Sequence, residues 1–588
     1  MTSSIGRPPG RYTPIAYYKL GEMYKNGNRH AGVPRDLNEA ARLLRRAVDQ
    51  DFAPAQYLLG QMYRRGNGVP QDLQEASLLY QRAASHGNTD AQSTLAVMYA
   101  EGVGVPQDDD EACRLCRLAA DQGNEVAQYN LGNWYYDGRH GLNQDLGESA
   151  RLFQLAADQG YGSANLYLAR MYTNGEGVPQ DFEEAGRFRL LAAEQGDIYA
   201  LCELGNTHYT GDGVPKNHKE AARFYRLAAD KDHAIAQFKL GNMYDEGEGV
   251  KRNTKKAARL LRRAAEQGHG EAQNNLGNKL KHGDGVQRNV KEAARLYELS
   301  AAQGIAQGQH NLSLMYRAGL GVPQDLGEAV RLLRLAADQT DPGALNELGL
   351  MYLSGEGVVL DKAEAIRLFE LAADQDFADS QCVLGQLYSR NSVYYGVPQN
   401  LEKAICYFRS AVKQGYHIAQ YCLGWAYFVG EGVPIDLDEA ARLFRCSADQ
   451  GNEDSQCILG QMYANGEGVP LDNAKAVGFY RLAADQGNSN AQNCLGHMYR
   501  KGTGVRRNNK KALRLFRLAA EQGDADAQFN LGAMHADGLG VQRDYAEAVK
   551  LYRLAAEQGQ EGAIRALDAM KRAGLIPTTN TQVIEGGK

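Results

Sequence analysis

Apolar and polar positions follow one repeating pattern along the chain. A first segment carries apolar or small residues at helical spacing, as at Ala55, Leu59, Met62 and Tyr63. This spacing predicts an amphipathic α-helix. After a glycine-containing turn, a second segment of the form E-A-x-R-L-x-R-L-A-A predicts another helix that buries its Ala and Leu side chains. Each period therefore predicts a helix-turn-helix unit.

The unit recurs fifteen times, marked by a small anchor residue after the Leu of L-G-x-M-Y. The anchors are Gly21, Gly60, Ala96, Gly132, Ala169, Gly205, Gly241, Gly277, Ser313, Gly349, Gly385, Gly424, Gly460, Gly496 and Gly532. Eleven of the fourteen intervals are 36 residues. Because one helix pair cannot bury its apolar face alone, neighbouring pairs must stack. We predict an all-α, right-handed superhelical α/α solenoid over residues 15–573, closed by a half-repeat. Residues 1–14 are expected to form a leader, and residues 574–588 a polar tail.

The turn between the two helices contains G-x-G-V in twelve repeats, for example at Gly466 and Gly468. A phosphate-binding loop would occur once, after a strand. Glycine tolerates a positive φ, so it ends the first helix. An Asp or Asn begins each second helix, and Glu follows three residues later in most copies, a spacing similar to a capping box. The glycine pair is therefore predicted to be architectural.

The motif A-Q-x-x-L-G-x-M-Y-x-x-G-x-G-V-x-x-D-x-x-E-A closely resembles the SEL-one-like repeat (SLR), a relative of the tetratricopeptide repeat. The resemblance covers residues 15–573. It implies an adaptor or scaffold whose first helices line a concave surface and bind partner proteins. A cysteine-rich SLR subgroup joins the two helices of each repeat by disulfides, and this sequence departs from that pattern.

Composition excludes several classes of function. Lys and Arg number 65 against 71 Asp and Glu, a net charge of -6, which argues against a nucleic-acid partner. No apolar run approaches the ~20 residues of a membrane span, and the start lacks a secretory h-region. We therefore expect a cytoplasmic protein whose nine cysteines are reduced thiols. Cys113 and Cys116 form C-R-L-C without a second metal-binding pair, so they are predicted to pack in the core.

Departures from the consensus identify candidate binding residues. Positions three before, one after and four after the anchor share one stripe of the first helix. In most repeats this stripe is polar or small, but in repeat 12 it holds Tyr421, Trp425 and Phe428, flanked by Ile418. An insertion with Tyr394 and Tyr395 precedes it. Exposed aromatic residues are frequent anchors for protein partners, so this stripe is a candidate site; padding of the groove is the alternative.

A second aromatic group lies in repeat 4, again beside an insertion. It contains Tyr129, Asn133, Trp134 and Tyr136. Asparagines continue along the same helix faces at Asn130, Asn133, Asn206, Asn242, Asn275, Asn278 and Asn311. Asn both donates and accepts hydrogen bonds, so this row is predicted either to bind an extended peptide backbone or to bridge helices. The peptide grooves of the tetratricopeptide family look similar here, and their carboxylate clamp also needs facing cations. Lys239, Lys279 and Lys281 are the candidates for these cations.

These patterns predict a non-catalytic scaffold that binds an extended peptide or surface segment of partner proteins in its concave groove. We expect no catalytic residues, metal site or cofactor. Partner proteins can themselves be membrane proteins. Two alternatives remain open: a small-molecule or cell-wall-fragment binding protein or enzyme on the same solenoid, and a structural homo-oligomer.

Overall fold

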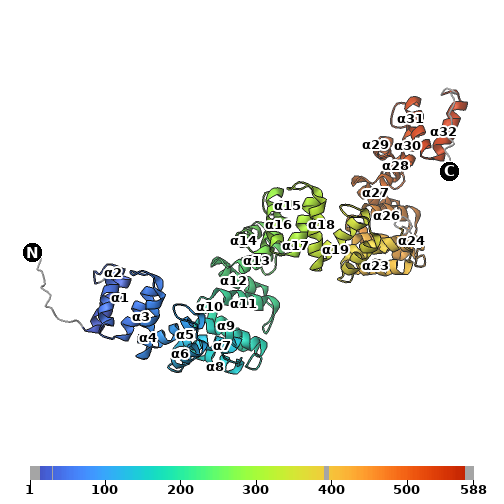
Figure 1. The fold of residues 1–588 in the computed structure, drawn as a ribbon. Helices are drawn as coiled ribbons and strands as arrows, with labels where there is room; N and C mark the ends of the chain where they lie inside the picture. The colour runs from blue at the N-terminus through green and yellow to red at the C-terminus, as the bar shows by residue number, and fades with distance from the viewer. Residues whose placement is uncertain (1–12, 29–30, 390–395, 576–588) are drawn as a thin grey trace, which may run out of the picture. The chain divides into compact units, whose positions relative to one another are not determined.

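A computed structural model describes residues 13–28, 31–389 and 396–575 of the chain. Its contacts divide the chain into two compact units, Met1–Asn289 and Val290–Lys588. The described residues are helical apart from turns and one isolated bridge between Asn28 and Val33. Figure 1 shows helix following helix along each unit. The predicted all-α solenoid is confirmed.

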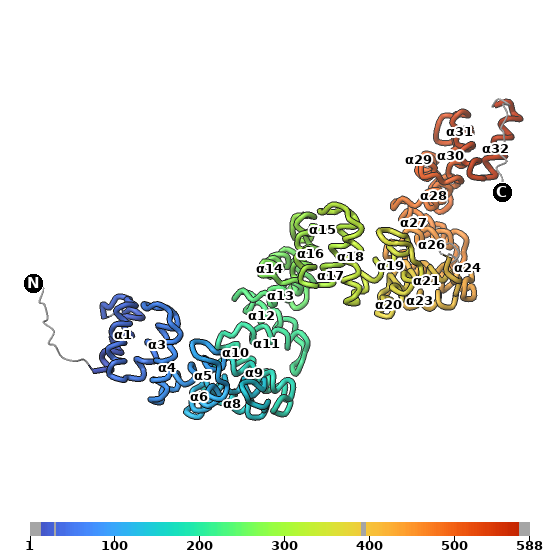
Figure 2. The backbone as a smooth tube through the Cα atoms, viewed as in Figure 1, coloured from blue at the N-terminus to red at the C-terminus, as the bar shows by residue number. Residues whose placement is uncertain are grey.

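The helices of the first unit are α1 Pro14–Asn26, α2 Leu37–Val48, α3 Ala53–Arg65, α4 Leu73–Ser85, α5 Thr89–Glu101, α6 Asp109–Asp121, α7 Glu125–Asp137, α8 Leu146–Asp158, α9 Gly162–Asn174, α10 Phe182–Glu194, α11 Ile198–Thr210, α12 His218–Asp230, α13 Ala234–Glu246, α14 Thr254–Glu266 and α15 Gly270–His282. Those of the second unit are α16 Val290–Ala302, α17 Ala306–Ala318, α18 Leu326–Asp338, α19 Pro342–Ser354, α20 Lys362–Ala373, α21 Ala378–Tyr388, α23 Leu401–Lys413, α24 His417–Val429, α25 Leu437–Asp449, α26 Glu453–Asn465, α27 Asn473–Asp485, α28 Ser489–Lys501, α29 Asn509–Glu521, α30 Ala525–Asp537, α31 Tyr545–Glu557 and α32 Glu561–Arg572. Figure 2 traces the alternation of helices and turns. The last described helix, α32, follows the fifteenth helix pair, where a closing half-repeat is predicted.

The turn glycines are architectural, as predicted. Gly466 caps α26 in the left-handed region, with φ 75°, and its N–H donates to the Met462 carbonyl at 2.8 Å. Gly468 has φ 64°, and a Cβ there would lie 2.2 Å from the Leu437 carbonyl oxygen of the preceding repeat. The second glycine therefore allows one turn to sit directly on the second helix of the repeat before it.

Second helices begin with the predicted Asp or Asn cap. Asp72 accepts from the backbone N–H groups of Gln74 and Glu75 at 3.0 and 2.9 Å. The Glu at the third helical position has a different role from the one that the capping-box spacing suggests. In α6, both carboxylate oxygens of Glu111 accept from Arg114, at 2.7 and 2.6 Å. Such exposed i, i+3 pairs stabilise a helix by about 0.3–0.5 kcal/mol.

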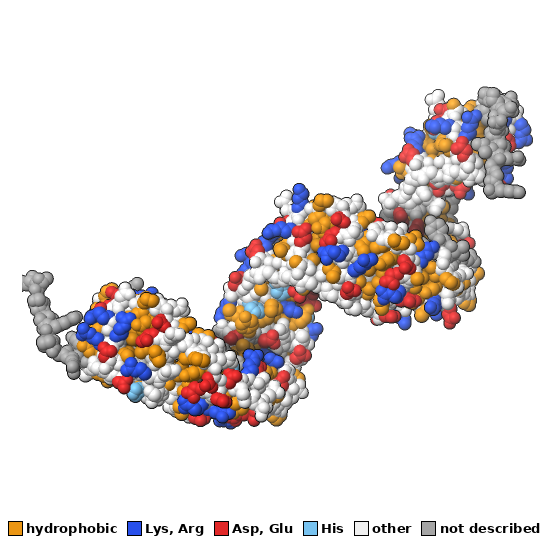
Figure 3. Space-filling view, viewed as in Figure 1, with side chains coloured by type: hydrophobic (Ala, Val, Ile, Leu, Met, Phe, Trp, Pro, Cys, Tyr) orange, Lys and Arg blue, Asp and Glu red, His pale blue; other side chains and the backbone are white. Residues whose placement is uncertain are grey.

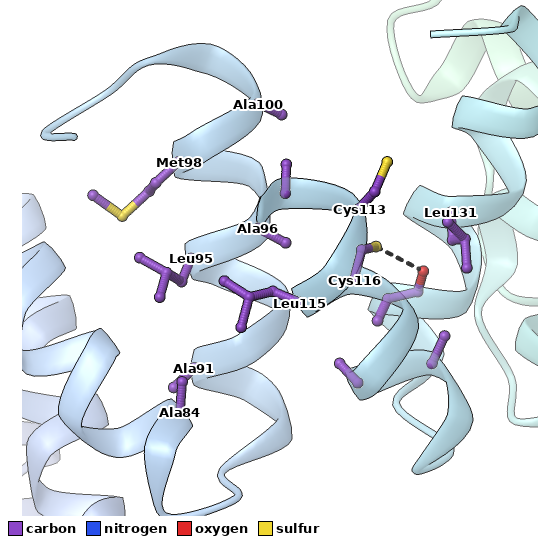
Figure 4. Packing of buried hydrophobic residues seen from close by; sticks show 14 of the residues in the cluster. Ala84, Ala91, Leu95, Ala96, Met98, Ala100, Cys113, Leu115, Cys116 and Leu131 are labelled. Carbon is purple, nitrogen blue, oxygen red and sulfur yellow. Dashed lines mark hydrogen bonds between the residues drawn. The ribbon is translucent and has the colours of Figure 1, made fainter. Parts of the chain in front are cut away.

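The small anchor residue lets a second-helix ring pack against the first helix. A Cβ on Gly60 would lie 2.7 Å from the ring of Tyr80, which is fully buried. Figure 4 shows the core around α5, α6 and α7, in which Cys116 donates to the Ala127 carbonyl at 3.4 Å. Cys113 and Cys116 are both buried, which confirms that they pack in the core.

Polar residues of the consensus bind the repeats together. Gln92 on α5 donates to the carbonyl of Ala84, which ends the second helix of the preceding repeat, at 3.2 Å. It also accepts from Gln122, which follows α6, the second helix of the same repeat, at 3.0 Å. It thereby satisfies a carbonyl at a helix end that would otherwise lack a partner. The same Gln–Gln bond recurs for Gln159–Gln128, Gln267–Gln237, Gln339–Gln309, Gln414–Gln381, Gln450–Gln420, Gln486–Gln456, Gln522–Gln492 and Gln558–Gln528. These bonds explain why A-Q and D-Q-G persist in the sequence.

Candidate functional site

Trp425 is the exposed member of the repeat-12 stripe. It lies on α24, one residue after the anchor, and 41% of its surface is accessible. Its ring stacks on Phe428 with centroids 5.7 Å apart. Phe428 and Tyr421 are half-buried, with ring centroids 6.3 and 6.0 Å from that of buried Phe444. The stripe therefore consists of one exposed indole and two half-buried rings, of which Phe428 stacks on the indole.

A cavity of about 380 Å³ lies beside Trp425. Its lining comes from α21, α23, α24 and the following turn: Gln386, Ser389, Leu401, Ala404, Ile405, Phe408, Tyr421, Cys422, Trp425, Ala426 and Glu431. Polar and apolar groups thus share the wall, which suits a ligand that is neither wholly apolar nor charged.

The cavity has a sequence cause. Ala426 stands two residues after the anchor, a core position that is Met in ten repeats: Met23, Met62, Met98, Met171, Met243, Met315, Met351, Met462, Met498 and Met534. Replacing a long buried side chain by Ala leaves space when the surroundings do not collapse. Thr207 occupies the same position in repeat 6, and a second cavity of about 390 Å³ lies beside it. Two cavities thus coincide with two short side chains at one consensus position.

The flanks of the stripe differ in how far they are described. Ile418 is partly buried and packs on the cluster around Phe408 and Leu423. Val429 is exposed at the end of α24. Tyr394 and Tyr395, also predicted to contribute, lie outside the described residues.

The aromatic residues of repeat 4 are less available than expected. The prediction of an exposed patch is wrong for Trp134, which is 9% exposed and belongs to the core cluster. The reason is its register, because it occupies the same inward position as the Met residues. Tyr129 packs among Phe153, Tyr161 and Tyr167, with ring centroids 4.7–5.8 Å away.

Tyr136, the last aromatic residue of the repeat-4 stripe, forms a link to the next repeat. Its hydroxyl donates to Glu176 Oε2 at 2.5 Å, and the Arg170 guanidinium lies over its ring. Burial and this bond raise the pKa of Tyr136 to about 12. Its polar atom is therefore already paired within the fold.

The asparagine row divides between bridging and open positions. Asn275 donates to Asn242 Oδ1 at 3.1 Å, and Asn206 accepts from the Tyr225 hydroxyl at 2.7 Å. These three bridge helices. Asn130 and Asn133 are half-buried, and their side chains have no hydrogen-bond partner among the described residues. Asn278 and Asn311 both have partners within the fold.

Lys279 cannot serve as a free cation of a carboxylate clamp. Its ammonium group contacts Asp245 Oδ1 at 2.5 Å and Asp284 Oδ2 at 2.8 Å, and the residue is 4% exposed. It stands at the core position that is usually Met. The sequence indicates that both Lys279 and Ala426 are unusual, because each departs from the Met consensus at the inward position two residues after the anchor. Ala426 is not part of the outward stripe, and Lys279, expected as a free cation, is instead paired in the core.

Other chemistry is sparse in the described part of the chain. No group of three or more His, Cys, Asp or Glu side chains is placed to hold a metal ion there. Among the same residues, no helix combines the length and apolar character required to cross a membrane. Charged side chains of both signs are interspersed on the face shown in Figure 3.

A family model described as Sel1 repeat matches fifteen successive segments of the chain. They are residues 14–52, 53–88, 89–124, 126–161, 162–197, 198–233, 234–269, 270–305, 306–341, 342–377, 378–416, 417–452, 453–488, 489–524 and 525–560. The chain is a Sel1 repeat protein. The resemblance to the SLR family is thus confirmed, and its repeats coincide with the helix pairs described above.

Two solved structures are similar to the chain, and the first of them has the same fold. A protective antigen present in uropathogenic Escherichia coli strains, displaying an SLR fold, is 27% identical over 93% of this chain and 99% of that chain, with a TM-score of 0.54. A Sel1 repeat protein from Oxalobacter formigenes is 32% identical over 57% of this chain and 94% of that chain, with a TM-score of 0.41. No curated protein sequence matches the chain.

Proposed function

We propose that this Sel1 repeat protein is a non-catalytic scaffold that binds an extended segment of a partner protein along its first helices, with repeat 12 as the principal contact. The observation that carries the proposal is Trp425. Its indole is exposed, is supported from below by Phe428, and borders a cavity. Exposed, rigidly held Trp residues dominate many protein interfaces.

The cavity supplies a place for a partner side chain beside this anchor. A volume of about 380 Å³ admits an aromatic or aliphatic side chain. Gln386 and Glu431 on its wall offer polar atoms to the backbone that would carry such a side chain. Asn130 and Asn133 on α7 are secondary candidates, since their amides are open to a peptide backbone.

We place the protein in the cytoplasm. All nine cysteines are free thiols, which supports a reducing compartment.

Site-directed photo-crosslinking tests the proposal. A photoreactive phenylalanine analogue replaces Trp425 in one variant and Leu482, an exposed second-helix residue, in a matched control. In native lysate we expect a discrete crosslinked protein at position 425 that is absent at position 482. Equal crosslinking at both positions would count against repeat 12 as the binding surface.

The cavity also favours a second candidate, a small-molecule binding site. If position 425 gives no protein adduct, mass spectrometry of the purified protein under native conditions is the deciding measurement. A bound compound that is lost on Ala426→Met would support the small-molecule function, since Met fills the cavity.

A further inference from the structure

Two second helices, α14 and α29, break the charge pattern of the other repeats in the same way. Their sequences, K-R-N-T-K-K-A-A-R-L-L-R and R-R-N-N-K-K-A-L-R-L-F-R, begin at residues 251 and 506. Each of these twelve-residue segments starts in the turn before the helix and holds six exposed cations and no acid. In the first unit these form a strip of Lys251, Arg252, Lys255, Lys256, Arg259 and Arg262; in the second, a strip of Arg506, Arg507, Lys510, Lys511, Arg514 and Arg517.

In eight other second helices an Arg is paired with the Glu three residues before it. Arg114 pairs with Glu111 at 2.6 Å, and the same i, i+3 pair recurs in α2, α8, α10, α12, α18, α20 and α25. In α14 and α29, Lys256 and Lys511 replace that Glu, and Asn replaces the Asp cap. None of the twelve cations forms an ion pair within 4.0 Å among the described residues. No carboxylate at that distance therefore neutralises these charges.

The arrangement is also unfavourable for the helix itself. The N-terminal end of a helix carries a partial positive charge, so cations in the first turn destabilise it. Lys256 and Lys511 lie over the rings of Tyr244 and Tyr499, at 5.3 and 5.2 Å, which recovers part of this cost. Lys403 and Lys475 lie over Tyr388 and Tyr463 in the same way in α23 and α27, so this single position has a role within the fold. The run of further cations around it distinguishes α14 and α29 and indicates a use outside the fold.

The spacing of the cations fits an extended polyanion. Lys510, Arg514 and Arg517 lie at i, i+4 and i+7, so they share one face of α29. With a rise of about 1.5 Å per residue, neighbouring charges are about 4.5–6 Å apart along the helix. Alternate side chains of an extended polypeptide are about 6.6 Å apart. Carboxylates at every second residue can therefore meet successive cations of the strip.

The surroundings favour a polypeptide over other polyanions. Single-stranded nucleic acid binds through exposed aromatic rings, and neither strip contains an aromatic side chain that is exposed. Membrane-surface helices need a large apolar face; among the described residues α14 has no exposed large hydrophobic residue and α29 has a single one, Leu518. We infer that each strip is a docking surface for an acidic polypeptide segment with Asp or Glu at alternate positions. This surface is on second helices and does not depend on the function proposed for repeat 12.

Fluorescence anisotropy with a labelled fourteen-residue Glu-Ser peptide tests the inference, using the full chain. The double variant Lys256→Glu/Lys511→Glu restores the consensus residue that the other repeats tolerate. We expect it to weaken binding at least tenfold at 50 mM salt. The control, Lys219→Glu/Lys475→Glu, makes the same charge change on exposed lysines of α12 and α27 and should stay within twofold.

Three further arms complete the design. A Gln-Ser peptide should bind at least tenfold more weakly than Glu-Ser, and 200 mM salt should weaken Glu-Ser binding. Trp425→Ala should leave it unchanged. The inference is overturned if the control variant loses as much affinity as the consensus variant, because net charge alone would then explain binding. It is also overturned if oligo(dT) or phosphatidylserine vesicles bind tenfold more tightly through the same lysines.

Discussion

Lys279 allows the energetics of the solenoid to be tested at one inward position. Lys279 is 4% exposed, and its ammonium group contacts both Asp245 on α13 and Asp284 in the turn after α15. Ten repeats carry Met at the equivalent position. We predict that Lys279→Met changes the free energy of unfolding by about 0 to +2 kcal/mol, in the stabilising direction, because burial of an apolar side chain replaces a costly desolvated cation.

Truncation should have the opposite effect. Lys279→Ala leaves a cavity and removes the charge partner of both carboxylates, so it should lower the free energy of unfolding by about 2 to 4 kcal/mol. The two carboxylates are 35% and 45% exposed, so water can solvate them when the cation is gone. Met98→Lys is the reciprocal control, because it places an ammonium group at the same position without acids nearby and should cost about 3 kcal/mol or more.

Urea unfolding followed by circular dichroism measures all three variants, with hydrogen exchange of α15 as the local readout. The hydrogen bond from Lys279 holds the pKa of Asp284 below its usual value. A lowered folded-state pKa adds stability above the unfolded value near 3.8, and this is lost as pH falls through the folded value. The advantage of Lys279→Met should therefore widen below about pH 4. A loss of more than about 1 kcal/mol for Lys279→Met at pH 7 would refute the reasoning.

Four further substitutions probe burial, packing and the cavity. Burial lowers the pKa of His497 to about 4. The unfolded state therefore binds the proton more readily than the folded state. The free energy of unfolding should fall by about 1–2 kcal/mol between pH 6.5 and 4, a figure reduced to allow for solvent exposure of the ring. His497→Gln should flatten this pH profile, and an unchanged profile would show that another group titrates. Gly496→Ala places a Cβ 2.7 Å from the Phe516 ring and should destabilise by about 1–3 kcal/mol in urea unfolding, whereas Gly478→Ala in α27, where nothing lies within 4 Å, should stabilise by about 0.5–1 kcal/mol. Ala426→Met should raise the thermal midpoint by filling the cavity while weakening partner binding; unaltered binding would exclude the cavity from the site.

Much of the fold could be predicted from the sequence because it depends on local rules repeated fifteen times. The anchor glycines, the Asp caps and the glycine turns each have one physical requirement, which the structure meets at Gly60, Asp72 and Gly466. The spacing of Glu111 predicted a capping box, but its carboxylate pairs with Arg114. Arg114 lies one turn further along the same helix, outside the residues that define the capping-box spacing.

The candidate site was less predictable because exposure depends on neighbours. Trp425 and Trp134 differ by one position relative to their anchors, and this difference places one ring outside and the other in the core. The outward stripe drew attention to aromatic residues. The cavity, however, lies beside Ala426 at an inward position, where an alanine in place of Met does not stand out in the sequence as an aromatic residue does. Hydrogen bonds such as Asn275 to Asn242 also join residues from different repeats, so a row of Asn does not reveal which amides remain open.

The affinity of the partner segment captured at position 425 is the measurement that tests the central claim most directly. Isothermal titration of that segment against wild type, Trp425→Ala and Leu482→Ala, each with helicity verified by circular dichroism, compares the exposed indole with an equally exposed second-helix side chain. We predict a loss of about 2 kcal/mol, near thirtyfold, for Trp425→Ala and less than threefold for Leu482→Ala. Equal affinities for all three proteins would contradict the proposal that repeat 12 is the partner-binding surface.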